Sequence, residues 1–249
     1  MKDIESVKQA RESFNRIIDN KTYAGIIRDD KHLAAIMSLV EDGSYDNILD
    51  IGTGTGYLAF PLAEMYPSST VYGIDIADAI IAKNQEIVGE KGIDNLKFQA
   101  FDGLQYPFEK ESIDLMVTRY AFHHFPNVVD AIQQMHNILR KGGRVMISDP
   151  MKHENDEKRI IDDYMGIKKD GHIQFYSAKE LDELFLQNGF IKEKQLITDM
   201  KFPFPPKQEY IDLFEKTCAE DKAMYEITNE NGVVWIRHIN VGNTVYVKV

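Results

Sequence analysis

Residues 49–57 read LDIGTGTGY, and this stretch decides the fold. It follows the apolar run Asn47–Ile51, which is typical of a buried strand, and it leads into an amphipathic segment typical of a helix. Gly52, Gly54 and Gly56 stand at alternate positions, where they allow a tight turn and a close approach of the backbone to a ligand. The first N–H groups of the following helix have no partner within it, so they favour a polar or anionic ligand group. The segment therefore predicts a strand, a turn and a helix, with a ligand bound at the turn.

Outward from this segment, short β-rich runs alternate with amphipathic helices as far as residue 150. Such an alternation requires right-handed crossovers, and it predicts a parallel sheet with helices on both faces. The expected strands are Asn47–Ile51, Thr70–Asp75, Leu96–Ala100, Ser112–Thr118 and Arg144–Ser148, and the expected helices between them are Tyr57–Met65, Ile76–Lys91 and Val128–Arg140.

The segments on either side of this core have a different pattern. Residues 1–44 are expected to form an N-terminal helical cover over the core at 45–150. Residues 151–249 are expected to hold a substrate-cover insertion and terminal sheet strands, all within one structural domain. At least one terminal strand should pair antiparallel at the sheet edge. Within the insertion, Ser177 and Glu180 have the spacing of a capping box at the start of a helix.

The composition is that of a globular protein, since 43% of the 249 residues are apolar and 28% are charged. Acidic residues outnumber basic ones by 40 to 29, and the net charge of −11 disfavours binding to nucleic acid or anionic lipid. Cys218 is the only cysteine, so no internal disulfide can form, which agrees with a reducing compartment. The N-terminal segment lacks the apolar stretch of a signal peptide, and no apolar run approaches the ~20 residues that cross a bilayer. We therefore expect a cytoplasmic protein without a membrane span.

Two further carboxylates follow expected strands. Asp75 ends the second strand, 19 residues after Gly56. In nucleotide-binding folds the ribose-binding carboxylate follows the glycine turn by about 20 residues, so Asp75 is expected to accept hydrogen bonds from both hydroxyls of a ribose. Capping of the next helix is the alternative role, although Asp78 is better placed for it. Asp102 and Gly103 follow the third strand, where the carboxylate can face the same crevice and meet the amino group of a base.

The order of these elements resembles the class I S-adenosylmethionine (SAM)-dependent methyltransferases, over roughly residues 45–150. The segment Arg119–Phe125, which reads RYAFHHF, is similar to the small-molecule branch related to ubiquinone/menaquinone-biosynthesis methyltransferases. The resemblance implies a Rossmann-like, doubly wound, mostly parallel seven-stranded α/β sheet with an antiparallel edge strand and helical cover segments. It also implies SAM as the methyl donor, S-adenosyl-L-homocysteine as a product, and a small molecule as the methyl acceptor.

The resemblance further implies which residues contact SAM, and each group of them contacts a different part of it. The residues are Asp50, Gly52, Thr53, Gly54, Thr55 and Gly56 for the amino-acid part, Asp75 for the ribose, Ile76, Asp102 and Gly103 for the adenine, and Arg119 for the region of the methyl group, with Tyr23 closing over the cofactor from the N-terminal segment.

The catalytic step itself needs few groups. Methyl transfer from SAM is an in-line displacement, in which alignment of the acceptor, the methyl carbon and the sulfur supplies much of the rate. A general base is needed only when the acceptor loses a proton. His123 and His124 follow the fourth expected strand and have an unperturbed pKa suited to this role, so they are the candidate bases, with structural packing as the alternative. His153-Glu154 lacks the His-Glu-x-x-His spacing of a zinc site, so no metal is expected.

Two other functions share the same cofactor crevice. A nicotinamide-dependent oxidoreductase has a G-x-G-x-x-G fingerprint, whose third glycine would come one residue later than Gly56. A non-enzymatic SAM-binding protein would share every cofactor residue named above. A nucleic-acid methyltransferase is disfavoured, because RYAF at residues 119–122 stands where methylation of base amino groups uses an Asn/Asp-Pro-Pro-aromatic motif.

Overall fold

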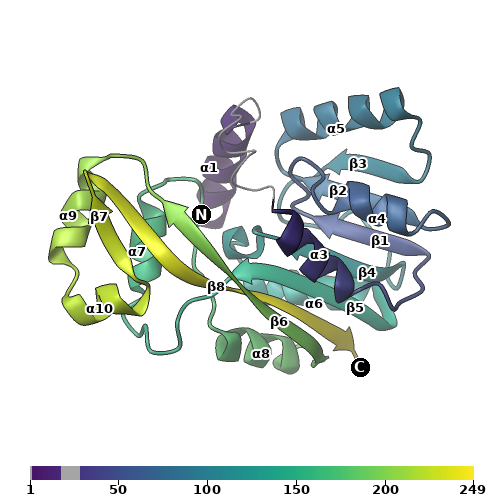
Figure 1. The fold of residues 1–249 in the computed structure, drawn as a ribbon. Coiled ribbons are helices and arrows are strands. Elements are labelled where there is room, and N and C mark those ends of the chain that lie inside the picture. Colours follow the sequence, from purple (N-terminus) through teal and green to yellow (C-terminus); the bar gives the residue numbers. More distant parts are fainter. Residues whose placement is uncertain (1, 18–28) are drawn as a thin grey trace.

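The computed structural model describes residues 2–17 and 29–249. In this part of the chain, one sheet runs through the molecule and helices lie on both of its faces (Figure 1). The strands are β1 Asn47–Ile51, β2 Thr70–Asp75, β3 Leu96–Ala100, β4 Ile113–Arg119, β5 Leu139–Pro150, β6 Phe190–Pro203, β7 Ile227–Glu230 and β8 Val233–Lys248. The helices are α1 Lys2–Ile17, α3 Asp30–Ser38, α4 Ala59–Met65, α5 Asp78–Lys91, α6 Val128–Ile138, α7 Ile160–Gly166, α8 Ala178–Gln187, α9 Gln208–Lys216 and α10 Ala219–Met224, with a short 3₁₀ helix, η1, at Phe122–His124.

The strand order is β3-β2-β1-β4-β5-β8-β6, and β7 pairs with β8. Strands β1 to β5 are parallel to their neighbours, while β8 runs antiparallel to both β5 and β6. This arrangement confirms the predicted α/β class with a mostly parallel sheet. Two details differ from the expectation: the antiparallel strand lies inside the sheet, and the described sheet has eight strands because β7 is added to the seven on the main path.

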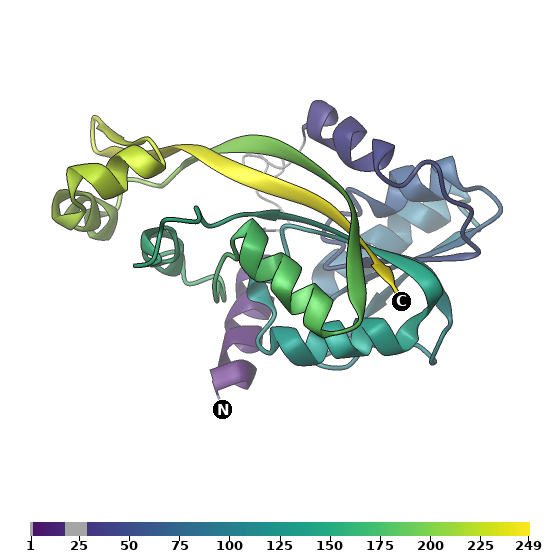
Figure 2. The same cartoon turned by 90° about the horizontal axis from the view of Figure 1, so that it is seen from below.

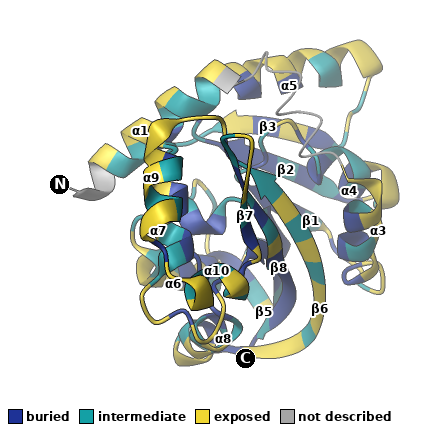
Figure 3. Ribbon diagram, turned by 60° about the vertical axis from the view of Figure 1, so that its left-hand side comes forward, coloured by how far each residue is buried: buried dark blue, intermediate teal, exposed yellow. Residues whose placement is uncertain are grey.

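The position of β8 follows from its side chains. Residues 241–246 are all buried, which suits a strand with neighbours on both sides and helices on both faces. Most of β6 is exposed or only half-buried, as Figure 3 shows, and it carries Lys192 and Lys194. Charged side chains, lysines above all, protect an edge strand from pairing with other chains. The sequence of β6 therefore suits the sheet edge, and that of β8 suits the interior.

The two faces of the sheet bury separate apolar clusters. In β1, Ile48 packs in a cluster with residues of α3, α4 and α5, whereas its neighbour Leu49 packs in a cluster with residues of α6 and α8. Successive strand residues point to opposite faces, so the two positions face different helix layers. Figure 2 shows α3 on one side of the sheet and α6 with α8 on the other. The carboxyl ends of β1, β2 and β4 lie between these layers, and this is where the site described below is built.

Beyond β5, the long strands β6 and β8 continue as a ribbon toward β7, α9 and α10 (Figure 1). A third apolar cluster fills this end of the molecule, and it includes Tyr164, Phe175, Phe204 and Tyr210. The predicted boundary at 150 coincides with the end of β5. The division into 1–44, 45–150 and 151–249 stays a prediction. No helix in the described residues is both long and apolar enough to cross a membrane.

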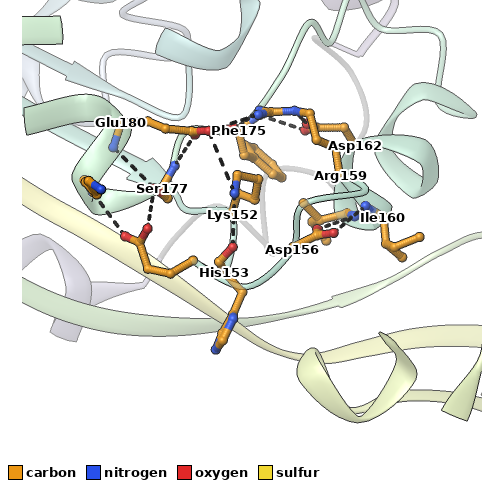
Figure 4. A network of polar contacts seen from close by, with 12 residues as sticks. Lys152, His153, Asp156, Arg159, Ile160, Asp162, Phe175, Ser177 and Glu180 are labelled. Atoms are coloured by element: carbon orange, nitrogen blue, oxygen red, sulfur yellow. Dashed lines mark hydrogen bonds and ion pairs between the residues drawn. The ribbon is translucent and has the colours of Figure 1, made fainter. Parts of the chain in front are cut away.

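A polar network fixes the segment between β5 and α8 (Figure 4). The Lys152 side chain is only 6% exposed, and its Nζ lies 3.8 Å from Glu180 Oε1. Arg159 donates to the Phe175 carbonyl and lies 3.3 Å from the same Glu180 oxygen. Ser177 and Glu180 form the capping box that their spacing predicts at the start of α8. Charged hydrogen bonds thus hold this segment against the core.

Candidate active site

A cavity opens at the carboxyl ends of β1, β2 and β4, beside the loop that follows β3. Strand order reverses between β1 and β4, which is the switch point where open α/β sheets bind their ligands. Helix α1 closes one side of the cavity with Val7, Ala10 and Phe14. Apolar side chains and glycines make up most of the wall, with a few polar groups among them, and this is the usual character of a small-molecule site.

The glycine turn lies along this cavity. Gly52, Gly54 and Gly56 all have positive φ, of 68°, 50° and 77°, so each occupies a backbone region that favours glycine. A Cβ added to Gly52 would lie 2.5 Å from the Ala121 Cβ, so close packing also requires this glycine. A Cβ added to Gly54 would meet no atom within 4 Å, although Gly54 lines the cavity. The open space beside Gly54 fits a ligand that approaches the backbone there.

Two buried carboxylates lie beside the turn. Thr53 Oγ1 donates to Asp50 Oδ2 at 2.6 Å, and burial raises the pKa of Asp50 to about 7 against the effect of this hydrogen bond. Asp75 accepts backbone N–H bonds from Gly54 at 2.8 Å and from Ala77 at 2.9 Å, and burial raises its pKa as well. Carboxylates with little access to water gain from a cationic partner. The pair therefore favours a ligand that carries positive charge.

Of the residues expected to contact the adenine, two line the cavity and the third makes hydrogen bonds within its own turn. Gly103 lines the cavity, as does Ile76, and a Cβ on Gly103 would lie 3.0 Å from the Ile76 side chain. Asp102 is exposed, and its Oδ1 accepts N–H bonds from residues 104 and 105, both at 2.8 Å. The carboxylate thus closes the turn after β3. Its predicted contact with the adenine amino group stays a prediction.

Arg119 is held at the cavity between two aromatic rings. Its guanidinium carbon lies 4.0 Å from the ring centroid of Tyr57 and 4.0 Å from that of Tyr120, which is cation–π geometry. The Tyr57 hydroxyl donates to the Asp29 carbonyl at 2.6 Å and so links this stack to the start of α3. Arg119 was predicted from the sequence, whereas its aromatic partners were not, because their spacing along the chain shows no common period.

The two candidate bases differ in their surroundings. His123 Nδ1 lies 2.9 Å from Asp149 Oδ2, and both side chains are buried. Burial lowers the pKa of His123 and raises that of Asp149 to about 8, so burial disfavours the charged form of each group. The cavity wall in the described part of the chain includes His124 but not His123. These contacts are those of a structural pair, and the role of His123 as a base stays a prediction.

His124 faces the cavity and packs edge-on against Phe14, with ring centroids 5.3 Å apart. Burial, with the neighbouring His123 acting in the same direction, lowers its pKa to about 3. The ring is therefore neutral at pH 7 and has a low affinity for a proton. Tyr23 lies outside the described residues, and the described side chains contain no group of three or more His, Cys, Asp or Glu residues arranged to hold a metal ion.

Residues 42–232 match a family model described as a methyltransferase domain. The chain belongs to this family. The match confirms the predicted methyltransferase, and it favours neither the nicotinamide-dependent nor the non-enzymatic alternative.

Individual relatives agree with the family. The uncharacterised methyltransferase YcgJ of Bacillus subtilis is 26% identical over 174 residues, which make up 68% of this chain and 65% of YcgJ, slightly less than two thirds of that protein. A demethylmenaquinone methyltransferase of Lactococcus lactis is 25% identical over 207 residues, or 75% of this chain and 79% of the relative.

Solved structures show the same fold at lower identity. The crystal structure of YcgJ superposes with a TM-score of 0.79 at 20% identity, covering 88% of this chain and 99% of YcgJ. A geranyl diphosphate C-methyltransferase of Streptomyces coelicolor, solved with S-adenosyl-L-homocysteine, has a TM-score of 0.63 at 16% identity and covers 88% of this chain and 79% of its own. These likenesses confirm the Rossmann-like fold class.

Proposed function

We propose that the protein transfers the methyl group of SAM to a small-molecule acceptor by in-line displacement. The observation that carries this proposal is the meeting of the glycine turn, two buried carboxylates and Arg119 at one cavity on the sheet's switch point. SAM supplies an activated methyl group on a sulfonium. Its sulfonium and ammonium charges suit the negative potential of Asp50 and Asp75.

The chain's own residues would bind and orient the donor. The Gly52–Gly56 turn, including Thr53 and Thr55, lets the backbone approach the amino-acid part, and Asp50 accepts from its ammonium group. Asp75 accepts from the ribose hydroxyls, while Ile76 and Gly103 bound the space for the adenine. Asp102 remains the proposed partner of the adenine amino group, and Arg119 lies at the methionine end.

Apolar side chains form much of the acceptor half of the cavity. Ala10 and Phe14 of α1 and Phe125 after η1 line this part of the cavity, and such walls exclude water and suit an apolar small molecule. The names of the demethylmenaquinone and geranyl diphosphate methyltransferases reported above support a small-molecule acceptor. The acidic net charge of −11 gives no support to a nucleic-acid acceptor. A cytoplasmic location stays a prediction that rests on composition.

A thermal-shift comparison of SAM, S-adenosyl-L-homocysteine and NAD tests the donor. At a concentration a hundredfold above its Kd, a specific ligand stabilises the folded protein by about 2.7 kcal/mol. We expect SAM and S-adenosyl-L-homocysteine to raise the melting temperature and NAD to leave it unchanged. A screen of small metabolites with methyl-labelled SAM then identifies the acceptor. Stabilisation by NAD alone would refute the proposed function.

A further inference from the structure

A buried polar chain leads from β8, through α3, to the cavity. Asn243 on β8 is 0% exposed, and its Oδ1 lies 3.0 Å from His32 Nε2 on α3. His32 is 5% exposed, and its Nδ1 lies 3.2 Å from the hydroxyl of Tyr120, which lines the cavity. The chain connects α3 with β8 and with the end of β4. Neither His32 nor Tyr120 belongs to the residues that the sequence predicts for SAM.

The direction of every hydrogen bond in this chain is fixed. Asn243 Nδ2 donates to the Leu196 carbonyl at 3.0 Å, and a carbonyl can only accept, so the amide orientation is determined. Asn243 Oδ1 is then the acceptor for Ser148 Oγ, at 2.8 Å, and for His32. His32 therefore carries its proton on Nε2. Burial lowers the pKa of His32, which keeps the ring neutral and leaves a lone pair on Nδ1.

It follows that the Tyr120 hydroxyl donates to His32 Nδ1. With its proton committed to the histidine and one lone pair accepting from the Arg119 side chain, the hydroxyl oxygen has its remaining lone pair to offer to a ligand. Tyr120 also has a φ of 53°, a left-handed conformation that is unusual for a bulky residue, and its backbone N–H is held by the Ser148 carbonyl at 2.9 Å. Backbone strain of this kind persists where surrounding contacts fix it, and it gathers at functional sites.

We propose that Tyr120 and His32 form a proton relay for a hydroxyl-bearing acceptor. Tyr120 contacts the acceptor, and His32 positions the Tyr120 hydroxyl. The inference rests on the proposed methyl transfer and names the chemical class of its acceptor. The cationic Arg119, stacked on the Tyr120 ring, disfavours a protonated amine in the same place. A neutral hydroxyl can donate to the remaining lone pair of the Tyr120 oxygen.

The step balances in atoms and charge. A lone pair of the acceptor oxygen forms the new bond to the methyl carbon, and the bond between that carbon and the sulfonium breaks. The acceptor proton passes to Tyr120 Oη while the Tyr120 proton passes to His32 Nδ1. The products are a methyl ether, S-adenosyl-L-homocysteine and an imidazolium at His32. The positive charge of the sulfonium is thus replaced by that of the imidazolium.

The groups that face the relay set its pH dependence. His32 is influenced by the Arg119 charge, which lowers its pKa, and by the Asp29 carboxylate, which raises it. Tyr120 is influenced by Arg119, Asp149 and Tyr57, and burial raises its pKa to about 12. Protonation of His32 blocks the relay. At saturating SAM, kcat should therefore fall at acid pH, with a midpoint below the ordinary histidine value of about 6.5.

The kinetic test compares Tyr120→Phe and His32→Gln with the wild type, using catechol and 1-octanol as hydroxyl probes and aniline and benzenethiol as comparators. Each variant should lower kcat on a hydroxyl probe by about 10²- to 10⁴-fold, and the double variant should lose no more than either one. The affinity for SAM, measured by calorimetry, should stay within about twofold. The acid limb of the kcat profile should disappear in His32→Gln.

Matched controls lie away from the cavity. Tyr66→Phe removes a tyrosine hydroxyl bonded to the Val40 carbonyl at 2.6 Å, and His136→Gln removes a histidine on α6. Both should keep the wild-type kcat. Nitrogen-15 spectra of the histidines provide a readout that needs no acceptor: the His32 signals, assigned by their loss in His32→Gln, should show Nε2–H and a hydrogen-bonded Nδ1 that changes in Tyr120→Phe.

The outcomes separate the two proposals. Failure of the wild type to bind SAM would refute the proposed function. Normal SAM binding with full activity in Tyr120→Phe, or methylation of aniline or benzenethiol but of neither hydroxyl probe, would overturn the relay alone. Where no probe is methylated, the spectra decide, since a His32 protonated on Nδ1 contradicts the relay and one protonated on Nε2 supports it.

Discussion

The donor and acceptor halves of the cavity are built in different ways. The donor half comes from the carboxyl ends of β1 and β2 and from the loop after β3. Its contacts, such as that from Thr53 to Asp50, join residues close together in the sequence. The acceptor half is assembled from α1, η1 and the start of α6, and its polar chain joins His32 to Asn243 across 211 positions. The difference shows that a site formed by a backbone turn can be predicted from a short stretch of sequence. A relay of side chains depends on residues that only the tertiary structure brings together.

The strongest test of the donor half is Gly54→Val, with Gly92→Val as its matched control. Both glycines have positive φ, of 50° and 63°, and in both an added Cβ would meet no atom within 4 Å. Each substitution should destabilise the fold by about 1–2 kcal/mol through the left-handed backbone. Only Gly54 lines the cavity, so only Gly54→Val should weaken SAM binding, by about 100-fold or more.

Calorimetry with SAM and thermal melting of both variants measure the two effects separately. Equal SAM affinity in folded Gly54→Val and Gly92→Val would show that the glycine turn does not approach the cofactor, and the contrast between the two halves would then fail.

The sequence predicts the donor half closely because its signals are local. The expected bounds of Asn47–Ile51, Thr70–Asp75 and Leu96–Ala100 are those of β1, β2 and β3. Each strand is a short β-rich run that ends at a turn, and glycines with positive φ mark the first of these turns. The helix at Val128 also begins where expected, since Asn127 caps it.

Features that depend on long-range contacts are not predictable in this way. The interior position of β8 depends on how the chain returns through the sheet, and no local pattern encodes that path. Asp102 has the same residue type and spacing whether it closes a turn or faces a base. The relay of His32 and Tyr120 becomes visible only when Asn243 fixes the direction of its hydrogen bonds.

A second, smaller effect concerns the pH dependence of SAM binding. Without ligand the pKa of Asp50 is raised to about 7, and the cationic donor binds the ionised form. Affinity should therefore be highest above pH 7 and should fall as the pH drops below it, by up to about tenfold per unit. Binding near pH 7 should release protons, because the protonated fraction of Asp50 must ionise when the cationic donor binds.

Calorimetry in buffers of different ionisation enthalpy measures this proton release, and Asp50→Asn should bind more weakly and with a flat pH profile. The acceptor half contributes nothing to this titration between pH 5 and 8 through His124, whose pKa is about 3. A steep profile that survives in Asp50→Asn would assign the titration to another group and would contradict the role of Asp50 in it.

The smallest expected effect is that of His124→Gln, which tests the base predicted from the sequence against the relay. His124 lines the cavity, but with a pKa of about 3 it takes up a proton far less readily than an ordinary histidine. Its replacement removes the edge-on contact with Phe14, so kcat on the identified acceptor should fall by less than about tenfold with SAM affinity kept. A fall of 10²-fold or more, with Tyr120→Phe fully active, would show that the histidine after β4 accepts the proton. The proton-accepting residue of the acceptor half would then be predictable from the sequence, as the residues of the donor half are.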